Sequence, residues 1–359
     1  MTLAHVNRIG TAVPDHDVHH TFIGFVDGLL PDDRSRRLFG RMAKRSGIDH
    51  RWSHFAPGER LDCAADREGF YARGSFPGTA ARMARFETGA LDLALRAVAA
   101  LDMEDGGASL THLVVASCTG FSAPGLDQQL VAALSLDPAI ERTLVGFMGC
   151  AAAVNALKLA HHIVRSEPAA RVLVVNVELC TLHMQETGDI DRNLTALLFG
   201  DGCTAALISS EPTGVALLDF KAVTIPDTRD LITWAVGDTG FQMHLSGEVP
   251  GQIIRALRHE ATRNEGGIFR GARPEDVDLW AVHAGGRTIL DAVEQGLALD
   301  GEALHWSRAI LREFGNMSSA TLMFVLDRIM KAASAGAAGF GMAFGPGLVA
   351  ETFRFRTAG

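Results

Sequence analysis

Short runs of almost uninterrupted apolar residues alternate with longer amphipathic stretches from about residue 86 to the end of this chain. Such runs are typical of sheet strands that are covered on both faces, and apolar residues at helical spacing indicate helices. The expected strands of the first part are residues 112–118, 143–147, 172–178 and 204–209. The expected helices between them are residues 86–103, 124–136 and 148–166. This alternation predicts a layered α/β fold.

The second part of the chain echoes the first. Its expected strands are residues 278–282, 339–344 and 348–355, and its expected helices are residues 287–299 and 318–336. The segment SSEPTG at residues 209–214 has the composition of a connection between the two parts. We therefore expect an internal pseudo-repeat with domains at residues 1–210 and 211–359. We also expect an irregular, charged stretch over residues 1–85.

Composition excludes several classes of function. The net charge of −9 opposes non-specific nucleic-acid binding, and no apolar run is long enough for a membrane span. The opening residues MTLAHVNRIG lack the apolar core of a signal peptide, and the five cysteines are scattered, so a cytoplasmic protein is expected. No CxxC, HExxH or GxGxxG motif stands where a site would need it, so we expect no metal and no dinucleotide cofactor.

Cys150 is the first candidate for chemistry. It stands in GFMGCAAAVNA between an expected strand and an expected helix, where the helix dipole stabilises a thiolate. Its small neighbours leave room for a substrate to approach the sulfur. The plain alternative is a cysteine that only fills space, since free cysteines are commonly buried.

His283 and Asn316 are the other two candidates. His283 ends an expected strand in AVHAGGRT, at the edge where open α/β sheets bind ligands, although a histidine bonded to backbone fits equally well there. Asn316 precedes an expected helix in EFGNMSSATL and is otherwise an ordinary helix cap. Together the three groups suit thioester chemistry. They supply a thiolate nucleophile assisted by an imidazolium, and two donors for the oxygen of an enolate.

The order of these motifs resembles the type III polyketide synthases, the chalcone synthase superfamily, from about residue 34 onward. The segments that carry the resemblance are THLVVASCTGF, PGLD, the Cys150 segment, RVLVVNVELC, ALLFGDG, VHAGG, FGNMSSA and FGPG. The resemblance implies a thiolase-type αβαβα five-layered fold, a homodimer, and a triad that falls on Cys150, His283 and Asn316. It also implies an acyl-CoA starter and malonyl-CoA as substrates, with no cofactor.

The resemblance assigns further positions around the substrate. Phe199 falls on an aromatic gatekeeper, and Met243 stands where plant members carry a second gatekeeper phenylalanine. Arg41 and Arg45 fall on basic positions that hold CoA phosphates, although a solvated basic face is the alternative for them. The other cavity or tunnel positions implied in this way are Cys118, Thr119, Ala123, Cys180, Ser318, Gly345, Pro346 and Gly347.

The same positions bear on the product. Small residues at Ala123 and Cys180 resemble bacterial alkylpyrone and alkylresorcinol synthases, whose tunnel accepts a long acyl chain. Cys118 and Cys180 also fit bacterial tetrahydroxynaphthalene synthases, which use malonyl-CoA alone. We expect decarboxylative condensation and cyclisation to an alkylpyrone or alkylresorcinol, with the malonyl-only synthase as the alternative. The starter is expected on CoA, with an acyl carrier protein as another donor.

Two rival functions fit part of the sequence. A single-condensation 3-ketoacyl synthase, of the ketoacyl synthase III kind or of the long-chain kind, uses the same residue types, and VHAGGR is similar to the latter. GNMSSA and FGPG resemble the type III polyketide synthases more closely. A catalytically inactive member that serves as a scaffold is the second rival, and the presence of all three triad residues opposes it.

Overall fold

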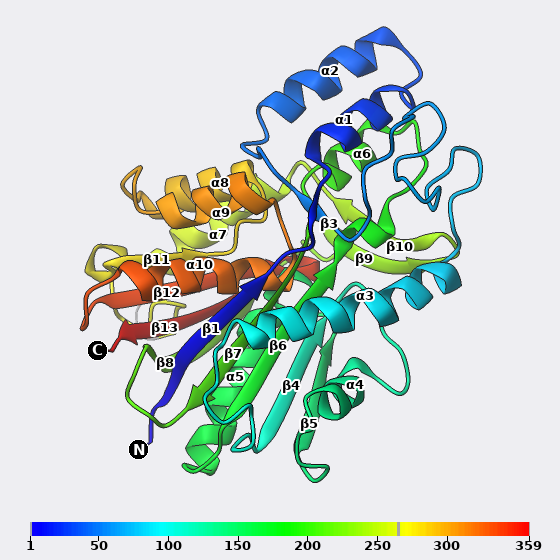
Figure 1. Ribbon diagram of the computed structural model, residues 1–359. Helices are drawn as coiled ribbons and strands as arrows, with labels where there is room; N and C mark the ends of the chain where they lie inside the picture. Colours follow the sequence, from blue (N-terminus) through cyan, green and yellow to red (C-terminus); the bar gives the residue numbers. More distant parts are fainter. Residues whose placement is uncertain (1, 264–265, 359) are drawn as a thin grey trace.

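A computed structural model describes residues 2–263 and 266–358 of the chain (Figure 1). Its strands are β1 (Ala4–Ala12), β2 (His16–Asp17), β3 (Trp52–Ser53), β4 (His112–Ser117), β5 (Glu141–Gly146), β6 (Val172–Leu179), β7 (Asp201–Ser209), β8 (Val215–Thr224), β9 (Ile232–Gly237), β10 (Gly240–Leu245), β11 (Leu279–Val282), β12 (Ala338–Gly345) and β13 (Val349–Thr357). Its α-helices are α1 (His19–Asp27), α2 (Asp33–Lys44), α3 (Thr79–Ala99), α4 (Leu126–Ala133), α5 (Ala152–Ser166), α6 (Ile190–Ala196), α7 (Val249–Ala261), α8 (Arg287–Leu297), α9 (His305–Phe314) and α10 (Ser319–Ala332). Short 3-10 turns occur at η1 (Gly149–Ala151), η2 (Cys180–His183), η3 (Pro274–Asp276) and η4 (Pro346–Leu348).

The main sheet contains the pseudo-repeat that the alternation of elements predicts. Its strand order is β11-β12-β13-β8-β1-β7-β6-β4-β5. In the N-terminal half, β4 is parallel to β6, and β6, β7 and β1 follow as antiparallel neighbours. In the C-terminal half, β11 is parallel to β12, and β12, β13 and β8 follow as antiparallel neighbours. The two halves therefore share one topology, and pairing of β1 with β8 joins them into one sheet.

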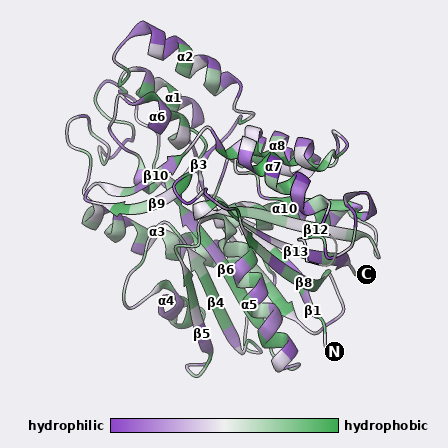
Figure 2. Cartoon of the chain, turned by 180° about the vertical axis from the view of Figure 1, so that it is seen from behind, coloured by the Kyte–Doolittle hydropathy of each residue, from purple (hydrophilic) through white to green (hydrophobic). Residues whose placement is uncertain are grey.

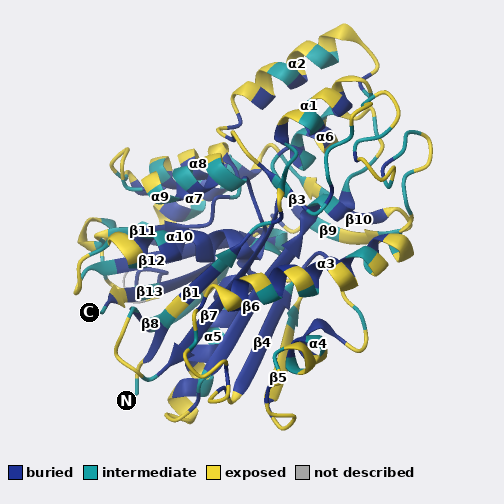
Figure 3. Ribbon diagram, viewed as in Figure 1, coloured by how far each residue is buried: buried dark blue, intermediate teal, exposed yellow. Residues whose placement is uncertain are grey.

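Helices cover this sheet in layers. Leu157 of α5 and Leu322 of α10 belong to one hydrophobic core, in which both helices pack on strands of both halves. Leu93 of α3 packs on the other face of the N-terminal half, and Ile253 of α7 and Leu290 of α8 pack on the other face of the C-terminal half. The order is therefore helix, sheet, helix, sheet, helix, which confirms the five-layered αβαβα fold. The sheet between the layers is buried, as β6 and β7 show in Figure 3.

Helices α1, α2 and α6 form a separate cap on the molecule, at the top of Figure 1. Phe39 and Ala43 of α2 pack there with Phe22 and Val26 of α1. Much of the remaining surface of α2 is hydrophilic in Figure 2, because arginine and lysine occupy half of its other positions. Within the residues that the structure describes, no helix combines the length and the apolar character that a membrane span requires.

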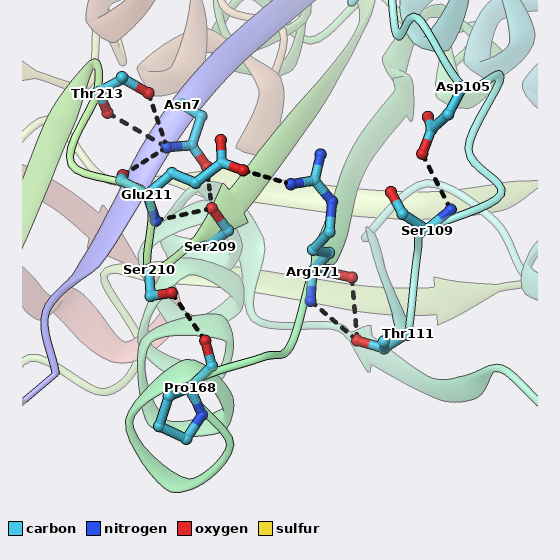
Figure 4. A network of polar contacts seen from close by, with 10 residues as sticks. All are labelled: Asn7, Asp105, Ser109, Thr111, Pro168, Arg171, Ser209, Ser210, Glu211 and Thr213. Atoms are coloured by element: carbon cyan, nitrogen blue, oxygen red, sulfur yellow. Dashed lines mark hydrogen bonds and ion pairs between the residues drawn. The ribbon is translucent and has the colours of Figure 1, made fainter.

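The expectation that residues 1–85 are irregular is wrong, because β1, α1, α2 and the first residues of α3 lie in this stretch. β1 lies between β7 and β8 near the middle of the sheet. Polar residues interrupt its apolar pattern, and Asn7 uses its side chain to donate to the carbonyl oxygen of Glu211 at 2.9 Å (Figure 4). The β9–β10 hairpin was likewise not expected. A strand whose polar residues find tertiary partners gives no clear periodicity in the sequence.

The largest differences from the expected helix boundaries occur in three helices. α3 begins at Thr79 rather than at Phe86, after the extended residue Gly78. The segment 148–166 begins with the turn η1 before α5 starts at Ala152. α10 ends at Ala332, ahead of the glycine at which the sequence places its end.

Candidate active site

A largely apolar cavity of about 300 Å³ opens between the cap, the β9–β10 hairpin and the residues that precede α5 and α10. Its wall contains most of the positions that the resemblance assigns to substrate. Those that line it are Cys118, Thr119, Cys150, Cys180, Phe199, Met243, Ser318, Gly345 and Pro346.

Cys150 lies in the turn η1, between the end of β5 and the start of α5, and is partly exposed toward the cavity. Gly149 before it has φ +60°, and a Cβ there would lie 2.4 Å from Cδ of Pro346. Only glycine therefore fits this turn without displacing the loop opposite. The close approach brings the Gly345–Pro346 segment against the turn that carries the sulfur.

Asn316 lies beside the sulfur. Its Oδ1 and Nδ2 atoms are 3.9 Å and 4.0 Å from Sγ of Cys150. Nδ2 also donates to the carbonyl oxygen of Gly285 at 3.2 Å, and Oδ1 accepts from the backbone N–H of Ser318 at 2.8 Å. These two bonds fix the orientation of the amide, so its nitrogen serves as a donor next to Cys150.

His283 follows β11, and its backbone N–H donates to the carbonyl oxygen of Met342 at 2.8 Å. The ring is buried, and neither ring nitrogen has a hydrogen-bond partner among the described residues. A Cβ at Gly285 would lie 3.6 Å from Nε2 of His283. His283 is therefore adjacent to the residue that holds the Asn316 amide. His283 and Asn316 do not themselves line the cavity and lie behind its wall.

Burial controls the charges of Cys150 and His283. It raises the pKa of the Cys150 thiol to about 12, against the hydrogen bonds from Ser318 and Asn316, which lower it. It lowers the pKa of His283 to about 3. Loss of hydration therefore opposes the stabilisation of a thiolate that the start of the helix is expected to provide. Burial favours the neutral thiol and the neutral imidazole when each is considered alone.

Phe199 lines the cavity, and its backbone pairs with that of Asn316 beside Cys150. Phe199 and Asn316 form a parallel bridge, and Asn316 N–H donates to the carbonyl oxygen of Leu198 at 2.8 Å. The carbonyl oxygen of Phe199 accepts from Nη1 of the buried Arg51 at 2.7 Å. Arg51, which also lines the cavity, thus fixes the backbone at Phe199. The sequence offers no signal for this role, because Arg51 stands in a charged segment with no motif.

Glu178 is a buried carboxylate that the sequence analysis did not single out. Its Oε2 accepts from the N–H of Cys118 and from the hydroxyl of Thr119, each at 2.9 Å, and Oε1 accepts from Ser319 Oγ at 2.6 Å. Burial raises its pKa, against these hydrogen bonds. The signal was available, since Glu178 is the one charged residue in a strand that is otherwise apolar except for Asn176. Glu178 ties the end of β4 to the start of α10.

An aromatic group forms another part of the cavity wall. The rings of His183 and Phe241 stack with centroids 4.2 Å apart, and Trp234 Nε1 donates to the carbonyl oxygen of Cys118 at 2.7 Å. Burial lowers the pKa of His183 to about 3. Trp234 lies opposite Met243 in the β9–β10 register. Because the sequence analysis missed the hairpin, it missed this wall as well.

Four assigned residues lie elsewhere. Ala123 is exposed and does not line the cavity of its own chain. Gly347 has φ +70° and shapes the loop after β12 without lining the cavity. Arg41 and Arg45 are exposed at the C-terminal end of α2, where cations face a helix dipole favourably.

Comparison with known proteins assigns the chain to a family. Its residues 2–212 match the N-terminal domain of the chalcone and stilbene synthases, and its residues 218–358 match their C-terminal domain. The alpha-pyrone synthesis polyketide synthase-like Pks18 of Mycobacterium tuberculosis is 37% identical over 276 residues, which cover 74% of this chain and 69% of that protein.

Solved structures of proteins similar to this chain have the same fold. PKS-I of the brown alga Ectocarpus siliculosus superposes with a TM-score of 0.86 and 29% identity, covering 99% of each chain. The 1,3,6,8-tetrahydroxynaphthalene synthase of Streptomyces coelicolor has a TM-score of 0.86 and 28% identity, with all of both chains covered. The chain therefore belongs to the chalcone and stilbene synthase family, the type III polyketide synthases, which are acyltransferases that join CoA thioesters by decarboxylative condensation without a cofactor.

Proposed function

We propose that Cys150 accepts an acyl starter from CoA, that malonyl units extend it, and that the product cyclises to an alkylpyrone or alkylresorcinol. The observation that carries this proposal is the position of the sulfur. Cys150 is partly exposed to a largely apolar cavity, and the Asn316 amide lies about 4 Å from it.

Loading needs the thiol proton to leave. His283 is the acceptor in this proposal, because its buried ring has free nitrogens and adjoins the Asn316–Gly285 contact. Proton transfer creates thiolate and imidazolium together, and their attraction offsets part of the cost of burying each charge. The thiolate then attacks the thioester carbonyl, and the CoA thiolate leaves and takes up a proton.

Extension places the second substrate at the same donors. Malonyl-CoA loses carbon dioxide, and the electron pair of the broken bond forms an enolate. The second Nδ2–H of the Asn316 side chain and a ring N–H of His283, which is neutral again once its proton has passed to CoA, stabilise the enolate oxygen. The enolate carbon attacks the acyl thioester on Cys150, which forms the new carbon–carbon bond and releases the Cys150 thiolate for another cycle.

One feature supports a long acyl starter, and a second supports a pyrone product. The cavity wall is largely apolar, and burial of each methylene contributes about 0.8 kcal/mol of binding energy. The Mycobacterium relative is named for alpha-pyrone synthesis. A malonyl-only synthase of the tetrahydroxynaphthalene type is the second candidate, because Cys118 and Cys180 both line the cavity.

Product analysis tests this function. The purified enzyme is incubated with malonyl-CoA and starters from acetyl-CoA to stearoyl-CoA, and products are identified by mass spectrometry. We expect cyclised products with two or more extensions and the highest yield from long starters. A naphthalene product from malonyl-CoA alone would establish the second candidate. Products of a single extension would identify a 3-ketoacyl synthase, and no turnover would leave only a scaffold.

We also propose that Arg41 and Arg45 bind the phosphates of CoA. Both are exposed cations on the cap, and α2 packs against α6, whose residues Arg192 and Asn193 line the cavity. A phosphate-bearing substrate that enters from the cap would pass them. CoA on the starter is the expected carrier in this arrangement, with an acyl carrier protein as the other donor. Cytoplasmic location stays a prediction.

A homodimer is proposed from an exposed apolar patch formed by Phe121, Leu144, Phe147 and Met148. Phe121 is 57% and Leu144 is 56% exposed, which is unusual for large side chains that are clustered. Ala123 adjoins this patch, so it would influence a cavity only across the dimer. Light scattering after size-exclusion chromatography should show a dimer for the wild type and a shift toward monomer for Leu144→Glu. A monomeric wild type would refute the proposal.

A further inference from the structure

A mixed cluster of one histidine and two glutamates lies at the opposite end of the sheet from the cavity. His112 begins β4, Glu141 begins β5, and these two residues are register partners in the parallel pair. Glu167 is the C-cap of α5. One ligand atom from each of the three lies within 4.8 Å of the others. Because the residues come from three separate segments, no motif in the sequence announces the cluster.

The histidine of this cluster is held in place. The His112 side chain is only 7% exposed, whereas that of Glu141 is 73% exposed. Nδ1 of His112 lies 2.8 Å from Oγ1 of Thr111. Nε2 of His112 lies 3.6 Å from Oε2 of Glu141, and this second distance is beyond an ordinary hydrogen bond. The ring is therefore fixed through Nδ1, and Nε2 faces the carboxylates without a close partner.

Thr111 can accept the Nδ1 proton of His112. Its hydroxyl has the carbonyl oxygen of Arg171 at 3.2 Å as an acceptor for its own proton (Figure 4). The backbone N–H of Arg171 also donates to Thr111 Oγ1 at 2.9 Å, which fixes the hydroxyl. With Nδ1 as the donor, the lone pair of Nε2 points at the two glutamates. A metal-binding histidine usually has this arrangement, with its other nitrogen donating to a fixed partner.

Charge favours a cation at this place. The neighbouring cations are already paired, Arg142 with Asp127 at 2.8 Å and Arg171 with Glu211 at 2.9 Å. The carboxylates of Glu141 and Glu167 thus place two negative charges close to the Nε2 lone pair of His112. A divalent cation would neutralise the carboxylates and satisfy Nε2 at once.

We propose that His112, Glu141 and Glu167 bind a divalent cation of the zinc type. One imidazole nitrogen with two carboxylate oxygens suits Zn²⁺ better than Mg²⁺, which prefers oxygen ligands alone. Ligand bonds to Zn²⁺ are about 2.0–2.2 Å, so the glutamates must close in, and their exposure leaves them free to do so. Water fills the remaining positions. The ion links the starts of β4 and β5 to the end of α5.

Zinc titration of the full-length protein tests the site. Tag-free protein is freed of metal with a chelator and titrated with Zn²⁺ against a competing colorimetric indicator. We expect one site per chain that His112→Gln and Glu167→Gln each weaken at least ~10-fold. His162→Gln is the matched control, because His162 is exposed on α5 outside the cluster, and its zinc affinity should equal that of the wild type. Mg²⁺ at equal concentration should not displace the zinc.

Thermal unfolding gives a second readout that does not depend on catalysis. A ligand that binds only the folded state raises the Tm, so Zn²⁺ should raise the Tm of the wild type and of His162→Gln but not of Glu167→Gln. Glu167 is exposed, so its variant decides the question if His112→Gln does not fold. The proposal is overturned if wild-type protein binds no Zn²⁺, or if both cluster variants bind it as tightly as the wild type.

Discussion

At the scale of single residues, the candidate site combines a thiol and an imidazole that burial keeps neutral when each is alone. Burial raises the pKa of Cys150 to about 12 and lowers that of His283 to about 3. Each group alone is therefore uncharged near neutral pH. Proton transfer between them is what would give a thiolate, so the two groups are expected to titrate as a pair.

His283→Gln should therefore suppress the reactivity of Cys150 at neutral pH. Without a base the thiol keeps a pKa of about 12, and at pH 8 only about 10⁻⁴ of it is thiolate. Its alkylation by iodoacetamide, followed by peptide mass spectrometry, should rise steadily with pH, whereas the wild type should react already near neutrality. Equal rates for both proteins at pH 7 would remove His283 from this role.

Asn316→Ala should slow the decarboxylation of malonyl-CoA by about 10²–10³, because one donor to the enolate oxygen is lost. Starter loading on Cys150 should change less, since the sulfur remains in place. Carbon dioxide release from labelled malonyl-CoA measures the effect. Asn316→Asp, which removes the N–H donor and keeps the size, should behave like the alanine variant, and undiminished release from both would exclude the assignment.

At the scale of elements, the β9–β10 hairpin shapes the cavity. It supplies Trp234, Phe241 and Met243 to the wall. A flexible, unbranched side chain at Met243 adapts to different occupants in a way that a rigid ring does not. The length of the starter should therefore depend on this hairpin.

Met243→Phe should reduce kcat/KM for long acyl-CoA starters more than for short ones, because a rigid ring at this position of the wall narrows the cavity. Val236→Phe is a control on the same hairpin, at a position that is 56% exposed and outside the cavity lining. Steady-state kinetics over a series of starters measures both variants. Equal losses across chain lengths would count against a tunnel at Met243.

The elements also show what the sequence could and could not predict. The strands at 112–117 and 172–179 were predictable, because buried strands are nearly continuous apolar runs. β1 was not, since its polar residues are satisfied by distant partners such as Glu211. The positions of Cys150, His283 and Asn316 followed from motifs. The supporting residues Arg51 and Glu178 depend on tertiary contacts that local patterns do not contain.

At the scale of the whole molecule, the two pseudo-repeated halves are one structure. β1 pairs with β8, so the sheet continues from one half into the other. The core between α5 and α10 draws residues from both. The candidate active site likewise takes residues from both halves, since Cys150 comes from one half and His283 and Asn316 come from the other. The division at residues 210 and 211 thus stays a proposal about ancestry and topology rather than about independent folding.

Leu322→Ala should lower the temperature of one common unfolding transition. Leu322 is fully buried in the shared core, and such a truncation costs about 2–5 kcal/mol. Scanning calorimetry should show a single peak that moves as a whole. Two separate peaks, with only one of them displaced by the substitution, would mean that the halves unfold independently.

The central claim is that Cys150 carries the growing chain. The direct measurement is mass spectrometry of the intact protein and of its peptides after brief mixing with a long-chain acyl-CoA. We predict one added acyl group, located on the peptide that contains Cys150, and none on Cys150→Ala, whose small side chain the turn accommodates. An acyl group on any other residue, or the same adduct on Cys150→Ala, would contradict the account.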